Sequence, residues 1–126
     1  MEKFLSKIIL IVEDDPSLLL SLKSKFEKEG FKVLTATNGK DGLKIAKSEK
    51  IDLILIDILL PEMDGISMAK EINKLKLGLP MIFLTNLSDI EHISKAITEN
   101  TTDYLVKADW NINDVVDRVR ERLKIK

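Results

Sequence analysis

Acidic side chains directly follow two of the apolar segments of this chain. Glu13, Asp14 and Asp15 come after the segment 8–12, and Asp57 ends a segment that begins at residue 52. Carboxylates held close together repel one another, by about 4 kcal/mol per pair at 4 Å with an effective dielectric near 20. A fold that gathers these acids therefore needs a cation. Oxygen ligands favour a hard divalent ion, which predicts Mg²⁺ with Mn²⁺ as a substitute.

A hydroxyl and an ammonium group follow two further apolar segments. Thr85 comes after residues 80–84, and Lys107 comes after residues 102–106. An aspartate whose charge is neutralised by a metal is a competent nucleophile toward phosphorus. Phosphoryl transfer mainly requires positioning and charge neutralisation, and the metal, Lys107 and the Thr85 hydroxyl would each hold one phosphoryl oxygen. The residue types therefore predict phosphoryl transfer to Asp57.

Each of these features has an ordinary structural interpretation when it is taken alone. Asp15 and Pro16 are typical of a helix N-terminus, with the aspartate as the cap and the proline in the first turn. Asp57, Thr85 or Lys107 alone would carry little information. The joint placement decides in favour of a site, because ligands of open parallel sheets bind beyond the carboxyl ends of the strands.

Short apolar segments alternate with amphipathic helical patterns along the chain. The expected strands are residues 8–12, 32–37, 52–57, 80–84 and 102–106. The expected helices begin at Asp15-Pro16 and end at Gly30, follow an Asn38-Gly39 turn, carry an apolar stripe from Ile66 to Leu75, run from Ser88 to about Glu99, and cover 112–123 after an Asn111 cap. Five βα units with short connections predict an α/β fold: a doubly wound five-stranded parallel sheet with five helices.

Length and composition fit one domain over residues 1–126, with 44% hydrophobic and 33% charged residues. The net charge of −1 gives no overall field that would attract nucleic acid or an anionic membrane. The chain has no cysteine, which excludes disulfides, thiolate metal sites and cysteine nucleophiles. Its first apolar run, residues 8–12, is too short for a signal peptide or a membrane span, so we expect a cytoplasmic protein.

Four segments of the chain resemble the receiver domain of two-component response regulators. They are Ile-Leu-Ile-Val-Glu13-Asp14-Asp-Pro, Leu-Ile-Leu-Ile-Asp57-Ile-Leu-Leu-Pro61-Glu-Met-Asp-Gly65, Ile-Phe-Leu-Thr85 and Asp-Tyr104-Leu-Val-Lys107. Any one of them is a weak signal, whereas all four in this order and at this spacing are highly specific. The resemblance covers residues 7–126.

The resemblance implies that Asp57 accepts a phosphoryl group from a histidine kinase or a histidine phosphotransfer domain. Thr85 and Lys107 would assist the transfer. The metal would contact Asp57 and Asp14 directly, Glu13 through water, and the backbone carbonyl of residue 59, which is Leu59.

The resemblance also implies a switch. Thr85 and Tyr104 would shift when Asp57 is phosphorylated, and a downstream protein partner would read the face formed by the fourth helix, the fifth strand and the fifth helix. The strand order 2-1-3-4-5 is likewise carried over from the family. Such a protein is a signalling domain and not an enzyme, with no nucleic-acid or membrane partner of its own.

Three positions depart from the family pattern. Asn86 replaces the usual small residue after Thr85, and Asn100-Thr101 replaces the usual Gly-Ala. Ala108 stands where proline usually follows the lysine. The usual Lys-Pro bond is cis, but a cis bond before alanine costs about 2.5–4 kcal/mol, so we expect a trans bond here.

Two other classes of function were compared with this one. An aspartate-nucleophile phosphatase requires Asp-x-Asp after its strand, and Asp57-Ile58-Leu59 lacks the second aspartate. A pseudo-receiver that acts only as a protein-interaction scaffold is the remaining alternative. It is disfavoured because all five positions that carry the chemistry are filled, by Glu13, Asp14, Asp57, Thr85 and Lys107. A flavin-binding function is also disfavoured, because the sequence lacks the Ser/Thr/Gly-rich phosphate loop that such a site needs after the first strand.

The side chains near the predicted phosphoryl pocket predict a long-lived acyl phosphate. Hydrolysis needs a water in line with phosphorus, and polar side chains can orient it. The two positions that matter most in the family are Leu59 and Leu87 here, and neither side chain can hold a water. We expect Leu59→Asn and Leu87→Glu to speed the decay of phosphorylated protein in excess Mg²⁺. Unchanged decay in both variants would show that the leucines do not set the lifetime.

Overall fold

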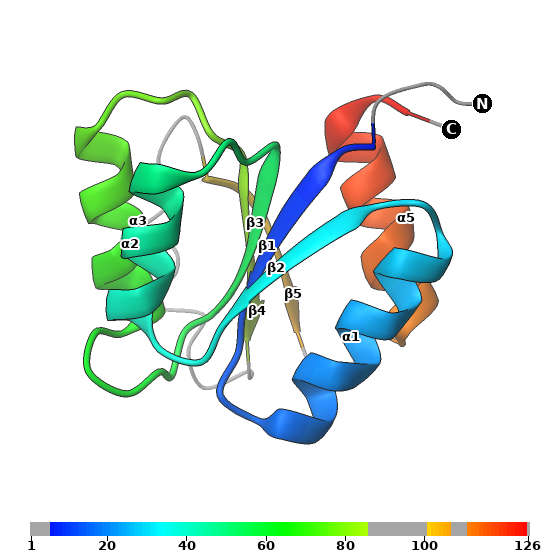
Figure 1. Cartoon of the computed structure of the whole chain (residues 1–126), viewed down its shortest axis with the longest axis horizontal. Helices are drawn as coiled ribbons and strands as arrows, with labels where there is room; N and C mark the ends of the chain where they lie inside the picture. Colours follow the sequence, from blue (N-terminus) through cyan, green and yellow to red (C-terminus); the bar gives the residue numbers. More distant parts are fainter. Residues whose placement is uncertain (1–5, 86–100, 107–110, 126) are drawn as a thin grey trace.

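The described chain is an α/β structure in which helices cover both faces of a parallel sheet (Figure 1). The structure, a computed structural model, describes residues 6–85, 101–106 and 111–125. The strands are β1 (Ile8–Val12), β2 (Lys32–Ala36), β3 (Leu53–Asp57), β4 (Met81–Thr85) and β5 (Thr101–Val106). The helices in these ranges are α1 (Pro16–Lys28), α2 (Gly39–Ser48), α3 (Gly65–Lys74) and α5 (Ile112–Leu123). The helix predicted over 88–99 and the Lys107-Ala108 bond lie outside the described residues.

The strand order places β1 and β3 side by side at the centre of the sheet. The order is β2-β1-β3-β4-β5, and all neighbouring strands are parallel. The chain therefore winds outward in one direction from β1 to β2 and in the other from β3 to β5. A parallel sheet with this reversal has its ligand crevice beyond the carboxyl ends of the two central strands.

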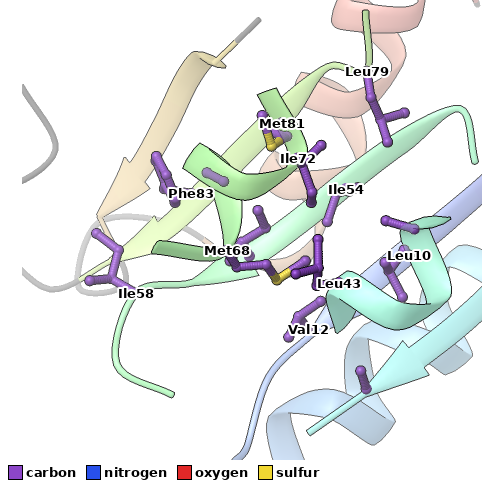
Figure 2. Packing of buried hydrophobic residues seen from close by; sticks show 14 residues of the cluster. Leu10, Val12, Leu43, Ile54, Ile58, Met68, Ile72, Leu79, Met81 and Phe83 are labelled. Carbon is purple, nitrogen blue, oxygen red and sulfur yellow. The ribbon is translucent and has the colours of Figure 1, made fainter. Parts of the chain in front are cut away.

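Strand β3 is buried along its whole length, as its unbroken apolar sequence predicts. Successive side chains of a strand point to opposite faces. Ile54 and Ile56 belong to the core cluster that includes residues of α2 and α3, whereas Leu53 and Leu55 belong to the cluster that includes residues of α1 and α5. Figure 1 shows these helix pairs on opposite sides of the sheet, and Figure 2 shows the first cluster from close by. The sheet thus has a hydrophobic core on each face.

Helix α1 begins and ends where the sequence predicts. The Asp15 side chain accepts hydrogen bonds from the backbone N–H groups of Ser17 (2.9 Å) and Leu18 (3.3 Å), and proline follows the cap. At the other end Gly30 has a φ of +96°, a conformation that glycine adopts without a steric cost. Asn111 caps α5 and forms a capping box with Asp114.

Two details of the sequence interpretation were wrong. Asn38-Gly39 is not a separate turn: the Asn38 side chain caps α2 by accepting a bond from the N–H of Asp41 at 2.7 Å, and Gly39 is the first helical residue. Leu75 does not extend the buried stripe of α3, because the helix ends at Lys74 and Leu75 is 39% exposed. Met68, which lies one turn from Ile72, fills the core instead.

An ion pair joins the end of α1 to α5. The Nη2 atom of Arg120 lies 2.7 Å from Oε1 of Glu29, and Nζ of Lys25 lies 3.3 Å from Oε2 of the same carboxylate. The hydrogen bond from Arg120, followed by that from Lys25, lowers the pKa of Glu29 below its ordinary value.

Because the folded-state pKa of Glu29 is lowered, its contribution to stability is present above the ordinary glutamate pKa and is lost as the pH falls through the folded value. We expect Glu29→Gln to lower the melting temperature slightly at pH 7, by an amount that shrinks in high salt because the pair is near the surface. The difference from wild type should vanish at acid pH. Glu27→Gln is the matched control, since Glu27 pairs with Lys23 within α1. A difference that stays constant from neutral to acid pH would contradict this role.

Candidate metal centre

Two acidic residues leave the central strands side by side. Val12 of β1 is paired with Ile56 of β3, so the next residues, Glu13 and Asp57, stand at the same edge of the sheet. One carboxylate oxygen each from Glu13, Asp14 and Asp57 lies within 4.8 Å of the other two. The structure thus brings together three of the acids that the sequence predicted to meet.

The three carboxylates differ in their exposure to solvent. Glu13 is 0% exposed and Asp57 is 6% exposed, whereas Asp14 is exposed. The Glu13 backbone N–H donates to the carbonyl of Ala36 on β2 at 3.0 Å, and its Oε2 accepts from the N–H of Asp15 at 3.0 Å. Both the backbone and the side chain of Glu13 are therefore held in place. The site therefore consists of two buried acids, Glu13 and Asp57, and one solvent-exposed acid, Asp14.

Asp15, the third acid of the run after β1, does not belong to this group. Its side-chain oxygen accepts the two N–H groups that open α1, as described above. This confirms the N-cap role that the sequence predicted for Asp15. Asp15 ends the loop and caps the helix, whereas Glu13 and Asp14 face Asp57.

Gly65 brings the start of α3 against the backbone of Asp57, a role that the sequence interpretation did not assign. A methyl group at Gly65 would overlap the carbonyl oxygen of Asp57 and lie 2.8 Å from Cγ2 of Ile56. The Gly65 N–H donates to the carbonyl of Ile58 at 2.8 Å, which closes the intervening loop. The signal was present in the sequence as a glycine after the acidic strand, but spacing alone could not show which backbone it approaches.

Leu59 lies on this loop, two residues after Asp57, and its side chain is 60% exposed. The loop also holds Glu62 at a φ of +66°, where residues other than glycine are uncommon. The metal contact expected from the Leu59 carbonyl is tested by none of these observations and stays a prediction. An exposed leucine at this point fits a segment that contributes to the site through its backbone and not through its side chain.

The other predicted site residues lie at the ends of β4 and β5. Thr85 is paired with Val106, so the last residues of both strands stand at the same edge as Asp57. Tyr104 is paired with Phe83 within β5. Lys107, which follows Val106 in the sequence, lies outside the described residues, as do the side chains of Thr85 and Tyr104. Their predicted roles in transfer and switching remain predictions.

The donor set fits a hard divalent cation. All three side chains offer carboxylate oxygens, and they bring up to three negative charges within 4.8 Å of one another. Mg²⁺ prefers oxygen ligands and usually keeps several waters, so one or two direct carboxylates are sufficient for it. The exposed position of Asp14 leaves an open side on which water and a further ligand can complete the coordination.

A family model described as "Response regulator receiver domain" matches residues 9–120. The alkaline phosphatase synthesis transcriptional regulatory protein PhoP of Bacillus subtilis (strain 168) is 35% identical over 120 residues. That match covers 95% of this chain but 50% of PhoP. The chain spans half or less of the length of PhoP and of other curated relatives that it matches.

Solved structures show the same likeness over nearly the whole chain. The Francisella response regulator 1452 receiver domain has a TM-score of 0.86 and 30% identity, covering 94% of this chain and 98% of that one. The receiver domain of sensor histidine kinase PA1611 from Pseudomonas aeruginosa PAO1 has a TM-score of 0.84 and 26% identity, covering 95% and 99%. The latter was solved with a magnesium ion coordinated in its active site cleft.

No helix within the described ranges combines the length and the apolar character that a membrane crossing demands.

The repulsion among the three carboxylates predicts opposite effects of one substitution with and without metal. Asp14→Ala should weaken Mg²⁺ binding, and it should raise the free energy of unfolding of the metal-free protein by about 1 kcal/mol, the value for a close pair of charges in contact with water. The measurements are a Mg²⁺ titration and a melting scan in EDTA. Glu49→Ala, an exposed acid at the end of α2, is the control for loss of a charge. A metal-free Asp14→Ala protein that melts below wild type would count against the repulsion.

Proposed function

Because the chain belongs to the response regulator receiver domain family, we propose that it accepts a phosphoryl group on Asp57 and acts as a signalling switch. The observation that carries the proposal is the convergence of Glu13, Asp14 and Asp57 at the ends of the two central strands. An acceptor aspartate beside two further acids fits metal-assisted transfer of an anionic group. The same aspartate without them would be only a buried acid.

Asp57 is the nucleophile of the proposed reaction. One of its carboxylate oxygens forms a bond to phosphorus, while the bond between phosphorus and the donor breaks and its electron pair stays with the donor. A bound Mg²⁺, or Mn²⁺ in its place, offsets the charge of the carboxylates and of the phosphoryl oxygens. The magnesium ion in the PA1611 receiver domain supports this choice of metal. Asp14 and Asp57 would hold it directly, Glu13 through water.

Lys107 and Thr85 complete the proposed phosphoryl site. The pairing of Thr85 with Val106 supports a hydroxyl and an ammonium group at the edge where Asp57 stands. The ammonium group would neutralise one phosphoryl oxygen and the hydroxyl would donate to another. Thr85 and Tyr104 form the proposed switch pair, and the Leu59 carbonyl is the proposed backbone ligand.

The donor is a histidine kinase or a histidine phosphotransfer domain. The message leaves through a downstream protein partner on the face of the helix predicted over 88–99, β5 and α5. With that predicted fourth helix, the five-stranded sheet would have the five helices of a flavodoxin-like fold. Residues 1–126 act as one receiver domain that works in the cytoplasm. Its own chemistry is limited to accepting the phosphoryl group and losing it slowly by hydrolysis, which makes it a signalling domain.

The scaffold alternative requires a site that does not take up phosphate. The acceptor aspartate and both neighbouring acids are present and gathered, and the relatives are response regulators, so the observations favour an active acceptor.

Incubation with acetyl phosphate and Mg²⁺ tests the proposal directly. We expect intact-mass spectrometry to show the addition of one phosphoryl group, and Asp57→Asn to abolish it, because the amide is a poor nucleophile and a poor metal ligand. The matched control is Asp52→Asn, at the opposite end of the β3 segment, which should retain labelling. Labelling that persists in Asp57→Asn, or that proceeds fully in EDTA, would overturn the mechanism.

A further inference from the structure

Gly39, the first residue of α2, lies against the loop that follows Asp57. A methyl group on Gly39 would overlap the carbonyl oxygen of Met63 and lie 2.7 Å from the carbonyl carbon of that residue. Gly39 has no positive φ, so its backbone conformation is open to any residue. The position requires glycine for the space that a Cβ would take.

The loop from Ile58 to Gly65 is held at three points. Its ends are joined by the hydrogen bond from the Gly65 N–H to the Ile58 carbonyl at 2.8 Å. Its tip is a tight turn in which the Met63 N–H donates to the Pro61 carbonyl at 2.7 Å. The third point is Met63, which is partly buried against the core cluster and lies next to Gly39. A displacement at Met63 must therefore be shared by the few residues between these points.

An obstruction at Gly39 would move the loop rather than the helix. Helix α2 is anchored through Leu43 and Ala46, which are buried in the same cluster as Val12 and Met68. Figure 2 shows Leu43 next to Val12 and Met68. Half of the residues of the loop are exposed, and the loop already holds Glu62 at a φ of +66°, a conformation that persists only when the surroundings impose it. The helix is the more rigid partner of the two.

We infer that Gly39 is a positioning residue for the metal site: the backbone of α2 presses on Met63 and so sets the path of the loop that carries the Leu59 carbonyl. This inference rests on the proposed function, in which that carbonyl is a ligand of Mg²⁺. Gly39 touches neither the metal nor the phosphoryl group. It acts through the main chain, where a shift of about 1 Å in a positioned group can reduce a rate by about 100-fold.

The test is a Mg²⁺ titration of the whole chain by calorimetry at a temperature where each variant is folded. We expect Gly39→Ala to weaken Mg²⁺ binding by about 10- to 100-fold, the range for loss of a group that supports a metal ligand. Phosphorylation by acetyl phosphate should slow at low Mg²⁺ and recover toward the wild-type rate at saturating Mg²⁺. The melting temperature in EDTA is measured alongside, so that a change in stability is separated from a change in affinity.

Gly42→Ala is the matched control. Gly42 lies one turn further along α2, and a methyl group there would meet Cε of Met68 at 2.9 Å and Cγ2 of Val12 at 3.0 Å, which are side-chain atoms and not part of the loop. We expect this variant to change the melting temperature and to keep the Mg²⁺ affinity of wild type. Met63→Ala is the second probe, because it removes the side chain that ties the same point of the loop to the core. It should weaken Mg²⁺ binding in the same direction as Gly39→Ala.

The outcomes separate the inference from the proposed function. Wild type that binds no Mg²⁺ and takes no phosphoryl group overturns both. Wild type that does both, with Gly39→Ala binding Mg²⁺ equally well, overturns the inference alone. Equal weakening in Gly39→Ala and Gly42→Ala also overturns it, because any disturbance of α2 would then suffice. If Gly39→Ala does not fold, Met63→Ala decides: weaker binding supports the inference, and unchanged binding overturns it.

Discussion

The proximity of three carboxylates at the ends of β1 and β3 is the constraint on which the rest of this structure depends. Their oxygens lie within 4.8 Å of one another, and two of the three residues are almost fully buried. Each close pair opposes folding by an amount of the order of 1–4 kcal/mol, depending on its exposure to water. The same repulsion is what a divalent cation relieves. The affinity for a metal and the destabilisation of the metal-free fold therefore have the same origin, which is the repulsion among the carboxylates.

The two central strands supply the stability that offsets this cost. Residues 9–12 of β1 and 53–56 of β3 are all fully buried, and each such apolar side chain contributes about 1.5–3 kcal/mol on leaving water. One buried side chain is thus worth about as much as one carboxylate pair costs. The pairing of Val12 with Ile56 also fixes the positions of Glu13 and Asp57, which follow them in the chain. The strands that stabilise the fold are therefore the same strands that bring the repelling carboxylates together.

The sequence predicted the elements and the meeting of the acids because both follow from short-range rules. Apolar segments of strand length and the Asp15-Pro16 cap are local, and parallel strands bring their carboxyl ends to one edge wherever they lie in the chain. Spacing alone could not assign Glu13 and Asp14 as the acids beside Asp57; that assignment came from the family resemblance, whereas the Asp15 cap was predicted from local sequence. Nor could spacing place Leu75 outside the core, because the end of α3 depends on the turn at residues 75–76, where Lys76 has a φ of +53°, and not on the apolar period.

The glycines show most clearly what spacing leaves out. Gly39 was interpreted as a turn residue, for which conformational freedom is the usual reason, and Gly65 was assigned no role, yet neither has a positive φ. Each is small because another stretch of main chain occupies the space of its Cβ: Met63 in one case and Asp57 in the other. The acids are therefore positioned by strands, while the loop beside them is positioned by contacts between main-chain atoms. Main-chain contacts leave no pattern of apolar or charged residues, and for this reason they are visible only once the chain is folded.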